Sequence, residues 1–150
     1  MKKVLYSLLI ITLIFIVTGC NNKQSNNIES NEIDNSNEVI SSMKVVINEE
    51  EYIINLEDNE TVKNFINMLP IELNMNELNG NEKYIYLDNT LPTNPYNPKR
   101  INAGDVMLYG NNCLVIFYES FDTPYSYTKM GHIDNLPDLG NGSVIVRFEK

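Results

Sequence analysis

The sequence has little of the chemistry that metal sites and nucleic-acid surfaces need. It contains one histidine, two cysteines and no tryptophan, and 11 basic residues stand against 20 acidic ones. A zinc site needs three or four Cys or His ligands, so the sequence predicts no metal site, and no motif in it predicts a cofactor. The formal net charge of −9 would repel phosphate backbones and anionic surfaces. It therefore predicts no nucleic-acid partner and favours cationic or neutral ligands.

The one long hydrophobic run is short for a membrane span. Residues 4–17 are apolar apart from Tyr6, Ser7 and Thr12, and they follow two lysines. A helix of this length rises about 21 Å, whereas the hydrocarbon core of a bilayer is about 30 Å thick. A basic start followed by a core of this length is typical of a signal peptide. An uncleaved membrane anchor is the alternative.

A cysteine follows this run in a characteristic context. The residues Val17-Thr18-Gly19-Cys20 resemble the lipobox of bacterial lipoprotein precursors. The resemblance implies a lipoprotein signal peptide over residues 1–19, cleavage before Cys20 and attachment of lipid to the Cys20 thiol. It also implies a lipid-anchored protein at the cell membrane that faces the extracytoplasmic side. An ordinary secretory signal is the alternative.

Residues 20–42 form the predicted tether behind the lipidated cysteine. After Cys20 the segment is nearly all Asn, Ser, Glu and single aliphatic residues, with no aromatic residue and no sustained period. Such a segment buries too little apolar surface to offset the entropy lost on ordering. We therefore expect it to be disordered.

Residues 43–150 carry the patterns of a folded domain. Hydrophobic residues alternate from Met43 to Ile47, and "YIINL" at residues 52–56 completes a predicted hairpin. The period then changes, because apolar residues recur at helical spacing between Val62 and Leu69. Asp58 or Asn59 is the expected N-cap, and Pro70 is expected to end this short helix.

The remaining segments are typical of short strands joined by turns. Asn79-Gly80 predicts a hairpin turn, and "LPTNPYNPKR" predicts an irregular loop because it holds three prolines. Strands are expected in "YIYL", on both sides of Gly110-Asn111-Asn112, in "YTKMGHI" and at the C-terminus. About eight strands and one short helix predict a mainly β domain, either a small closed barrel or a sandwich.

Several segments together resemble the bacterial cyclophilin-like family. They are "DNETVKNFINMLP", "LNGNEKY", "LPTNPYNP", "INAGDVMLYGNNCLVIFYESF" and "YSYTKMGHID". The resemblance implies a small closed cyclophilin-like β-barrel over residues 43–150, with one short helix near one end. Members of the family have largely unassigned functions and are sometimes carried on lipoproteins.

The resemblance does not extend to the catalytic residues of true cyclophilins. Those enzymes use an arginine in a Phe-His-Arg segment and line the proline pocket with Phe, Gln, Trp and His. This chain has no Phe-His-Arg segment and no tryptophan, and its two arginines, Arg100 and Arg147, match no such motif. Function belongs to sites rather than folds, so the resemblance assigns no catalytic residues to this chain.

Aromatic and charged residues near the predicted strand ends form the candidate pocket. Tyrosine rings would provide an apolar floor, while Glu82, Glu119 and Arg100 would hold a polar or peptide-like ligand at one mouth of the barrel. The alternative is structural, because half-buried tyrosines are common in small β domains. The candidate residues are Glu82, Tyr84, Arg100, Tyr109, Tyr118, Glu119, Tyr127 and His132, with Tyr125 in the same set.

Two single residues have both a structural and a chemical interpretation. Cys113 lies in "NNCLVIFY", which favours a buried, inert thiol; a nucleophile would need His132 as its base. His132, two residues before Asp134, is either a partly exposed strand residue or a base or pH sensor.

The leading functional prediction is a lipid-anchored extracytoplasmic binding module whose protein or small-molecule ligand is unknown. The lipobox, the tether and the lack of a catalytic motif motivate it. The alternative is a divergent peptidyl-prolyl cis-trans isomerase acting on extracytoplasmic proteins, which only the fold resemblance favours. A structural part of an envelope assembly is a third possibility.

Overall fold

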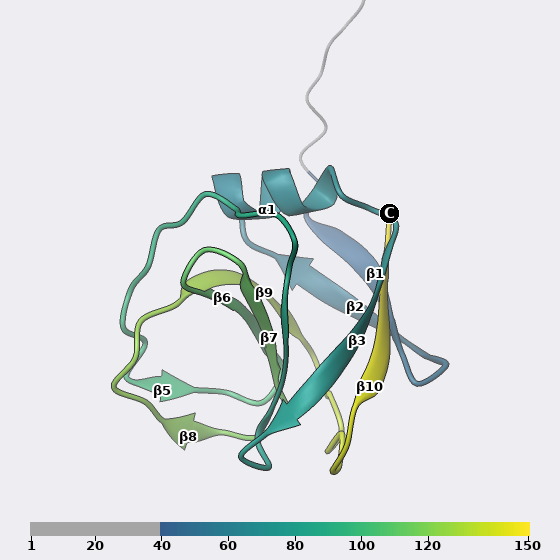
Figure 1. The fold of residues 1–150 in the computed structure, drawn as a ribbon, viewed down its shortest axis with the longest axis vertical. Helices are drawn as coiled ribbons and strands as arrows, with labels where there is room; N and C mark the ends of the chain where they lie inside the picture. Colours follow the sequence, from purple (N-terminus) through teal and green to yellow (C-terminus); the bar gives the residue numbers. More distant parts are fainter. Residues whose placement is uncertain (1–39) are drawn as a thin grey trace, which may run out of the picture. The chain divides into compact units, whose positions relative to one another are not determined.

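The computed structural model describes residues 40–150 (Figure 1). The predicted signal peptide, Cys20 and almost all of the tether lie outside these residues. The described chain forms ten strands and one helix. Their bounds are β1 (Ser42–Ile47), β2 (Glu50–Leu56), α1 (Glu60–Ile66), β3 (Ile71–Leu78), β4 (Glu82–Tyr86), β5 (Arg100–Ile101), β6 (Asp105–Tyr109), β7 (Cys113–Phe117), β8 (Phe121–Asp122), β9 (Thr128–Ile133) and β10 (Val144–Glu149). No helix within this range is long and apolar enough to cross a membrane.

Eight of the strands close into an antiparallel barrel. Their order around the barrel is β1-β10-β3-β4-β7-β6-β9-β2. Closure removes the free edges that would invite pairing with other chains. The prediction of a small closed barrel is confirmed, and the sandwich alternative is wrong. The two shortest strands, β5 and β8, pair only with each other and lie outside the barrel sheet (Figure 1).

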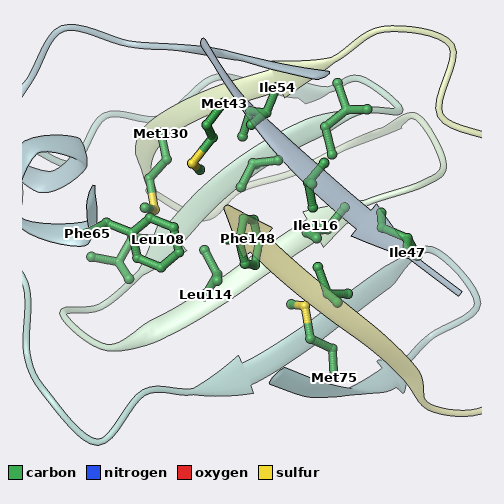
Figure 2. Close-up of a cluster of buried hydrophobic side chains, with 14 of the residues drawn as sticks. Met43, Ile47, Ile54, Phe65, Met75, Leu108, Leu114, Ile116, Met130 and Phe148 are labelled. Atoms are coloured by element: carbon green, nitrogen blue, oxygen red, sulfur yellow. The ribbon is translucent and has the colours of Figure 1, made fainter. Parts of the chain in front are cut away.

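The barrel interior is a continuous hydrophobic core. Side chains from β1, β2, β3, β6, β7 and β10 point into it (Figure 2). The helix α1 lies across one end of the barrel (Figure 1). Its Phe65 ring packs edge-to-face on Phe148 of β10, with centroids 5.2 Å apart. This packing explains why the helix carries an apolar face although it has only seven residues.

The predicted helix is confirmed, and its cap is resolved in favour of Asn59. The Asn59 side chain accepts a hydrogen bond from the Val62 backbone N–H at 3.0 Å and donates to the Lys129 carbonyl at 2.8 Å. The helix ends at Ile66, so Leu69 lies beyond it, although Leu69 still packs partly buried against the core. The predicted turn at Asn79-Gly80 is also present, since both residues adopt positive φ between β3 and β4.

The strand β7 is buried along its whole length, which distinguishes it from the alternating strands. Leu114 and Ile116 face the barrel interior. Cys113, Val115 and Phe117 face outward yet are also buried, because they belong to a second hydrophobic cluster on the outer wall. The unbroken apolar run of β7 therefore reflects cover on both faces.

Candidate functional site

The second hydrophobic cluster lies on the outer surface of β4, β6 and β7. It contains Ile101, Met107, Cys113, Val115, Phe117 and Tyr127, with Tyr84 and Phe121 packed partly buried against it. The Phe117 ring contacts the rings of Phe121 and Tyr127 with centroid distances of 5.6 and 5.5 Å. Phe121 belongs to β8 and Tyr127 directly precedes β9, so the segments around these two strands cover part of the outer wall.

A cavity of about 360 Å³ opens beside this cluster. Its volume is within the usual range for a small-molecule site. Outward-facing residues of β4, β6 and β7, the β3–β4 turn and the segment from Phe121 to Tyr127 supply the walls. The lining residues are Leu78, Asn79, Asn81, Glu82, Tyr84, Tyr86, Tyr109, Cys113, Val115, Phe121, Tyr125 and Tyr127. We call this cavity the outer pocket. It lies on the barrel wall, whereas the sequence patterns predicted a pocket at one mouth of the barrel.

Tyrosine rings form most of the apolar lining of the outer pocket. Tyr109 packs against Tyr125 and Tyr127, with centroids 6.1 and 5.5 Å apart. Tyr84 and Tyr86, both facing outward from β4, are 6.1 Å apart. Tyr86, Tyr109 and Tyr125 remain 64%, 45% and 58% exposed. Their rings are therefore available to a ligand instead of being consumed by packing.

Glu82 is the one ionisable carboxylate in the lining. It is partly buried at the start of β4, opposite Phe117 of β7. Burial raises the pKa of the Glu82 carboxyl to about 7, and the nearby Glu77 acts in the same direction. Among residues 40–150, no side chain forms an ion pair or hydrogen bond with it. The carboxylate thus faces the pocket without a partner.

Asn81 borders the pocket, but its side-chain oxygen is enclosed. Its backbone carbonyl accepts hydrogen bonds from the Tyr118 and Glu119 N–H groups, at 3.0 and 3.4 Å. Its side-chain Oδ1 is buried and has no donor among the described residues. An atom this enclosed leaves no room for a donor from the pocket, so Asn81 contributes to the wall and not to ligand contacts.

Cys113 lies against the pocket as an inert thiol. The residue is buried, and burial raises the pKa of the thiol to about 11, with Glu82 contributing. A thiol with this pKa stays protonated at neutral pH and is a poor nucleophile. The base that a nucleophile would need is also occupied: the Nδ1 atom of His132 lies 3.0 Å from Asp105, and its Nε2 atom lies 3.6 Å from Asp134.

Four of the eight predicted pocket residues line the outer pocket together, and four do not. Glu82, Tyr84, Tyr109 and Tyr127 line it, and so does Tyr125. Arg100 is exposed and paired with Asp122 at 3.0 Å. Glu119 is exposed, and His132 lies on β9 between two carboxylates.

Tyr118 is excluded for a geometric reason. It follows Phe117, and successive residues of an extended chain point to opposite sides of the sheet. Phe117 packs on the outer wall, so Tyr118 turns into the interior core. The same alternation identifies a residue that the sequence analysis missed, because Tyr86 stands two positions after Tyr84 and shares its face. No pattern in the sequence indicated that Asn81 lines the pocket.

A family model described as the cyclophilin-like family matches residues 45–149. This chain belongs to the cyclophilin-like family. The match runs from the middle of β1 to the end of β10 and therefore includes residues of all eight barrel strands. No curated protein and no solved structure gives a significant match to the chain.

Membership of the cyclophilin-like family assigns the fold and leaves the chemistry to the site. Among the described residues, no arginine lines the outer pocket; Arg100 is paired with Asp122, and Arg147 is paired with Glu149. No group of three His, Cys, Asp or Glu side chains within residues 40–150 is placed to hold a metal ion. The chemical groups that line the pocket include tyrosine rings and the Glu82 carboxylate.

Proposed function

We propose that the chain is a lipid-anchored extracytoplasmic binding module whose ligand occupies the outer pocket. The observation that supports it is a cavity of about 360 Å³ in which exposed tyrosine rings surround an unpaired carboxylate. Ligand sites combine a largely apolar lining with a few convergent polar groups. The outer pocket has this composition, and the residues of the barrel wall beneath it are buried.

The lining favours binding over catalysis. A hydrolytic or transfer reaction needs a nucleophile and a base within hydrogen-bond reach of each other. Cys113 is a buried thiol with a raised pKa, and the described structure places His132 outside the pocket lining. The isomerase alternative has no specific contact in its favour, since no arginine lines the pocket in the described chain.

A fragment screen tests the binding function. The full chain, held in a non-ionic detergent, is titrated with small neutral, cationic and anionic compounds while its amide NMR signals are followed. We expect at least one compound to shift signals of residues that line the outer pocket. Leu78→Trp fills the rim from an exposed position and should abolish these shifts. The matched control is Ile53→Trp, because Ile53 is also exposed but lies on β2, outside the lining.

Three results would count against the binding function. The first is a screen without binders. The second is a set of binders that Leu78→Trp and Ile53→Trp affect equally. The third is acceleration of prolyl isomerisation in a proline-peptide assay, lost in Leu78→Trp and retained in Ile53→Trp, which would replace binding by catalysis.

The lipid anchor has its own test. Cells expressing the chain are fed radiolabelled palmitate and fractionated. Cys20→Ala should lose the label and should either stay uncut or leave the membrane fraction. Cys113→Ala, which removes the other thiol, should keep both label and location. A Cys20→Ala chain that still matures and sediments with membranes would refute the lipobox interpretation.

A further inference from the structure

The polar groups of the outer pocket share a chemical bias. No lysine, arginine or histidine of the described chain lines it, and its only readily ionised group is a carboxylate. The other lining residues are aliphatic, amide, thiol and aromatic side chains. Any charge that enters the pocket therefore meets Glu82 alone.

Glu82 is left without a counter-charge by the fold itself. Lys83 is the next residue in the sequence, and its side chain lies on the opposite face of the sheet. Its ammonium donates to the carbonyls of Gly140 and Gly142 at 2.5 and 2.8 Å and lies 5.0 Å from the Tyr118 ring centroid. A partly buried carboxylate without a partner is unfavourable. A ligand that brings positive charge would remove this penalty.

The carboxylate also requires donors from its ligand. An ionised carboxylate accepts hydrogen bonds through both oxygens and donates none. A ligand that pairs with Glu82 therefore needs N–H groups as well as positive charge.

The aromatic lining suits such a ligand. The face of an aromatic ring is electron-rich and attracts cations within about 6 Å of its centroid. Tyr109 and Tyr125, and Tyr84 and Tyr86, form two edge-to-face pairs that border the cavity. Ring faces provide apolar contact for an alkyl chain and favourable electrostatics for its charged end.

We propose that the outer pocket binds a protonated alkylamine, whose ammonium group is recognised by Glu82 and the tyrosine rings. The group belongs either to a free small amine or to the lysine side chain of a protein partner, which present the same chemistry. This inference rests on the proposed binding function and names its ligand class.

The test uses probes that differ in charge and in hydrogen-bonding capacity. Butylammonium is the cationic probe, butan-1-ol its neutral analogue, and tetramethylammonium a cation without N–H donors. Each is titrated into the full chain in non-ionic detergent, and the dissociation constant is read from amide shifts of pocket residues. Butylammonium should bind at least about tenfold more tightly than butan-1-ol, since a charged hydrogen bond contributes this much. Tetramethylammonium should lie between them.

Glu82→Gln should weaken butylammonium binding about tenfold or more and leave butan-1-ol binding within about twofold. The matched control is Glu119→Gln, an equal loss of charge at an exposed residue outside the lining, which should leave every probe unchanged. A capped lysine tripeptide and its ε-acetylated form then separate the sources. Tighter binding of the lysine tripeptide than of butylammonium indicates a protein side chain, and the reverse order indicates a free amine.

The unmodified chain offers a second readout that needs no variant. Butylammonium affinity should rise about tenfold from pH 6 to pH 8, because the carboxyl of Glu82 has a pKa of about 7 and must be ionised to pair. The ammonium stays protonated in this range. Of the neighbouring groups, Glu77 on β3 acts on the carboxylate, while burial raises the pKa of Cys113 and of Tyr127 and keeps them neutral.

Two results would overturn the ligand class while leaving the binding function intact. One is binding of butan-1-ol as tight as that of butylammonium. The other is a butylammonium dissociation constant that changes neither with pH nor in the Glu82→Gln variant. If neither these probes nor the fragment screen moves any pocket signal, the proposed function fails together with its ligand class.

Discussion

Two neighbouring residues on β4 show how the two sides of the barrel wall differ. Lys83 points inward and is 0% exposed, yet its ammonium is satisfied by two backbone carbonyls and an aromatic ring. Glu82 points outward into a pocket and has no partner in the described chain. A buried charge with all its partners in the chain serves the fold. A partly buried carboxylate without one is the feature on which the proposed ligand depends.

Burial disfavours the charged form of both residues, but the nearby acids act on the two charges in opposite senses. Burial lowers the pKa of Lys83, while Glu77 and Asp138 oppose this shift. Burial raises the pKa of Glu82, and its neighbour Glu77 reinforces the shift. The acids near Lys83 therefore favour its charged form, whereas Glu77 disfavours the charged form of Glu82. Four changes, in order of decreasing expected effect, test this contrast.

The largest effect is expected from the interior core. Phe148→Ala removes a fully buried ring that packs on Phe65 and should lower the free energy of unfolding by about 3–5 kcal/mol. Tyr86→Ala removes an aromatic ring of the outer pocket that is mostly exposed and should cost less than about 1 kcal/mol. Urea unfolding followed by circular dichroism measures both. Similar losses for the two variants would show that the pocket is part of the core.

Lys83→Met should lower the free energy of unfolding by about 2–4 kcal/mol. The substitution removes two hydrogen bonds from the ammonium to the carbonyls of Gly140 and Gly142. A hydrogen bond to a charged group contributes about 1.5–3 kcal/mol, and water at the exposed glycines recovers part of this loss. The control is Lys63→Met on α1, where the exposed ion pairs to Asp58 and Glu60 contribute little. A Lys83→Met chain as stable as the control would mean that the interior ammonium is dispensable.

Glu82→Gln should raise the free energy of unfolding at high pH, whereas Lys83→Met should lower it. Because the carboxyl has a pKa of about 7 in the folded chain, above its ordinary value of 4.5, the folded state binds the proton more tightly. Stability from this group is therefore greatest below about pH 4.5 and is lost as pH rises through 7. After discounting for solvent screening, Glu82→Gln should raise the free energy of unfolding by about 1 kcal/mol at pH 8.

The measurement is a pair of urea titrations at pH 5 and pH 8, with Glu119→Gln as the control for loss of one negative charge. At pH 5 the Glu82→Gln and unmodified chains should differ little, since the carboxyl is then largely protonated. A Glu82→Gln chain that is less stable at pH 8 would show that the carboxylate has a partner within the protein.

The smallest effect is expected at Arg100. Its side chain is exposed and pairs with exposed Asp122, and such pairs contribute about 0–1 kcal/mol. Arg100→Ala should change stability by less than about 0.5 kcal/mol and leave butylammonium binding within twofold. Calorimetric titration and urea unfolding measure both. A large loss of binding would show that Arg100 contributes to the ligand site, as its sequence context predicted.

The elements whose signal is local were predictable. The hairpin turn at Asn79-Gly80, the apolar face between Val62 and Ile66 and the alternation of β10 depend on neighbouring residues alone. The paired strands β5 and β8 were not predicted, because a strand of two residues has no period to read. The helix end was placed too far along the chain, since Leu69 packs against the core without being helical.

The residues of the candidate site were also predictable only where a local pattern places them. Strand alternation places Tyr84 and Tyr86 on one face, and it separates Glu82 from Lys83 and Phe117 from Tyr118. Alternation does not reveal which face the rest of the chain covers. The pairing of His132 with Asp105, and of Arg100 with Asp122, joins residues 27 and 22 positions apart, and no local pattern carries that information.

By itself, the sequence determined a mainly β domain with one helix, because periods of 2 and 3.6 residues are properties of the backbone. Closure into a barrel was decided by antiparallel pairing between strands distant in the chain, such as β1 with β10. Only the tertiary structure decided that Lys83 is enclosed with its partners while Glu82 faces an open pocket. Which side of a strand is covered depends on the loops that pack over it, and those contacts form between residues far apart in sequence.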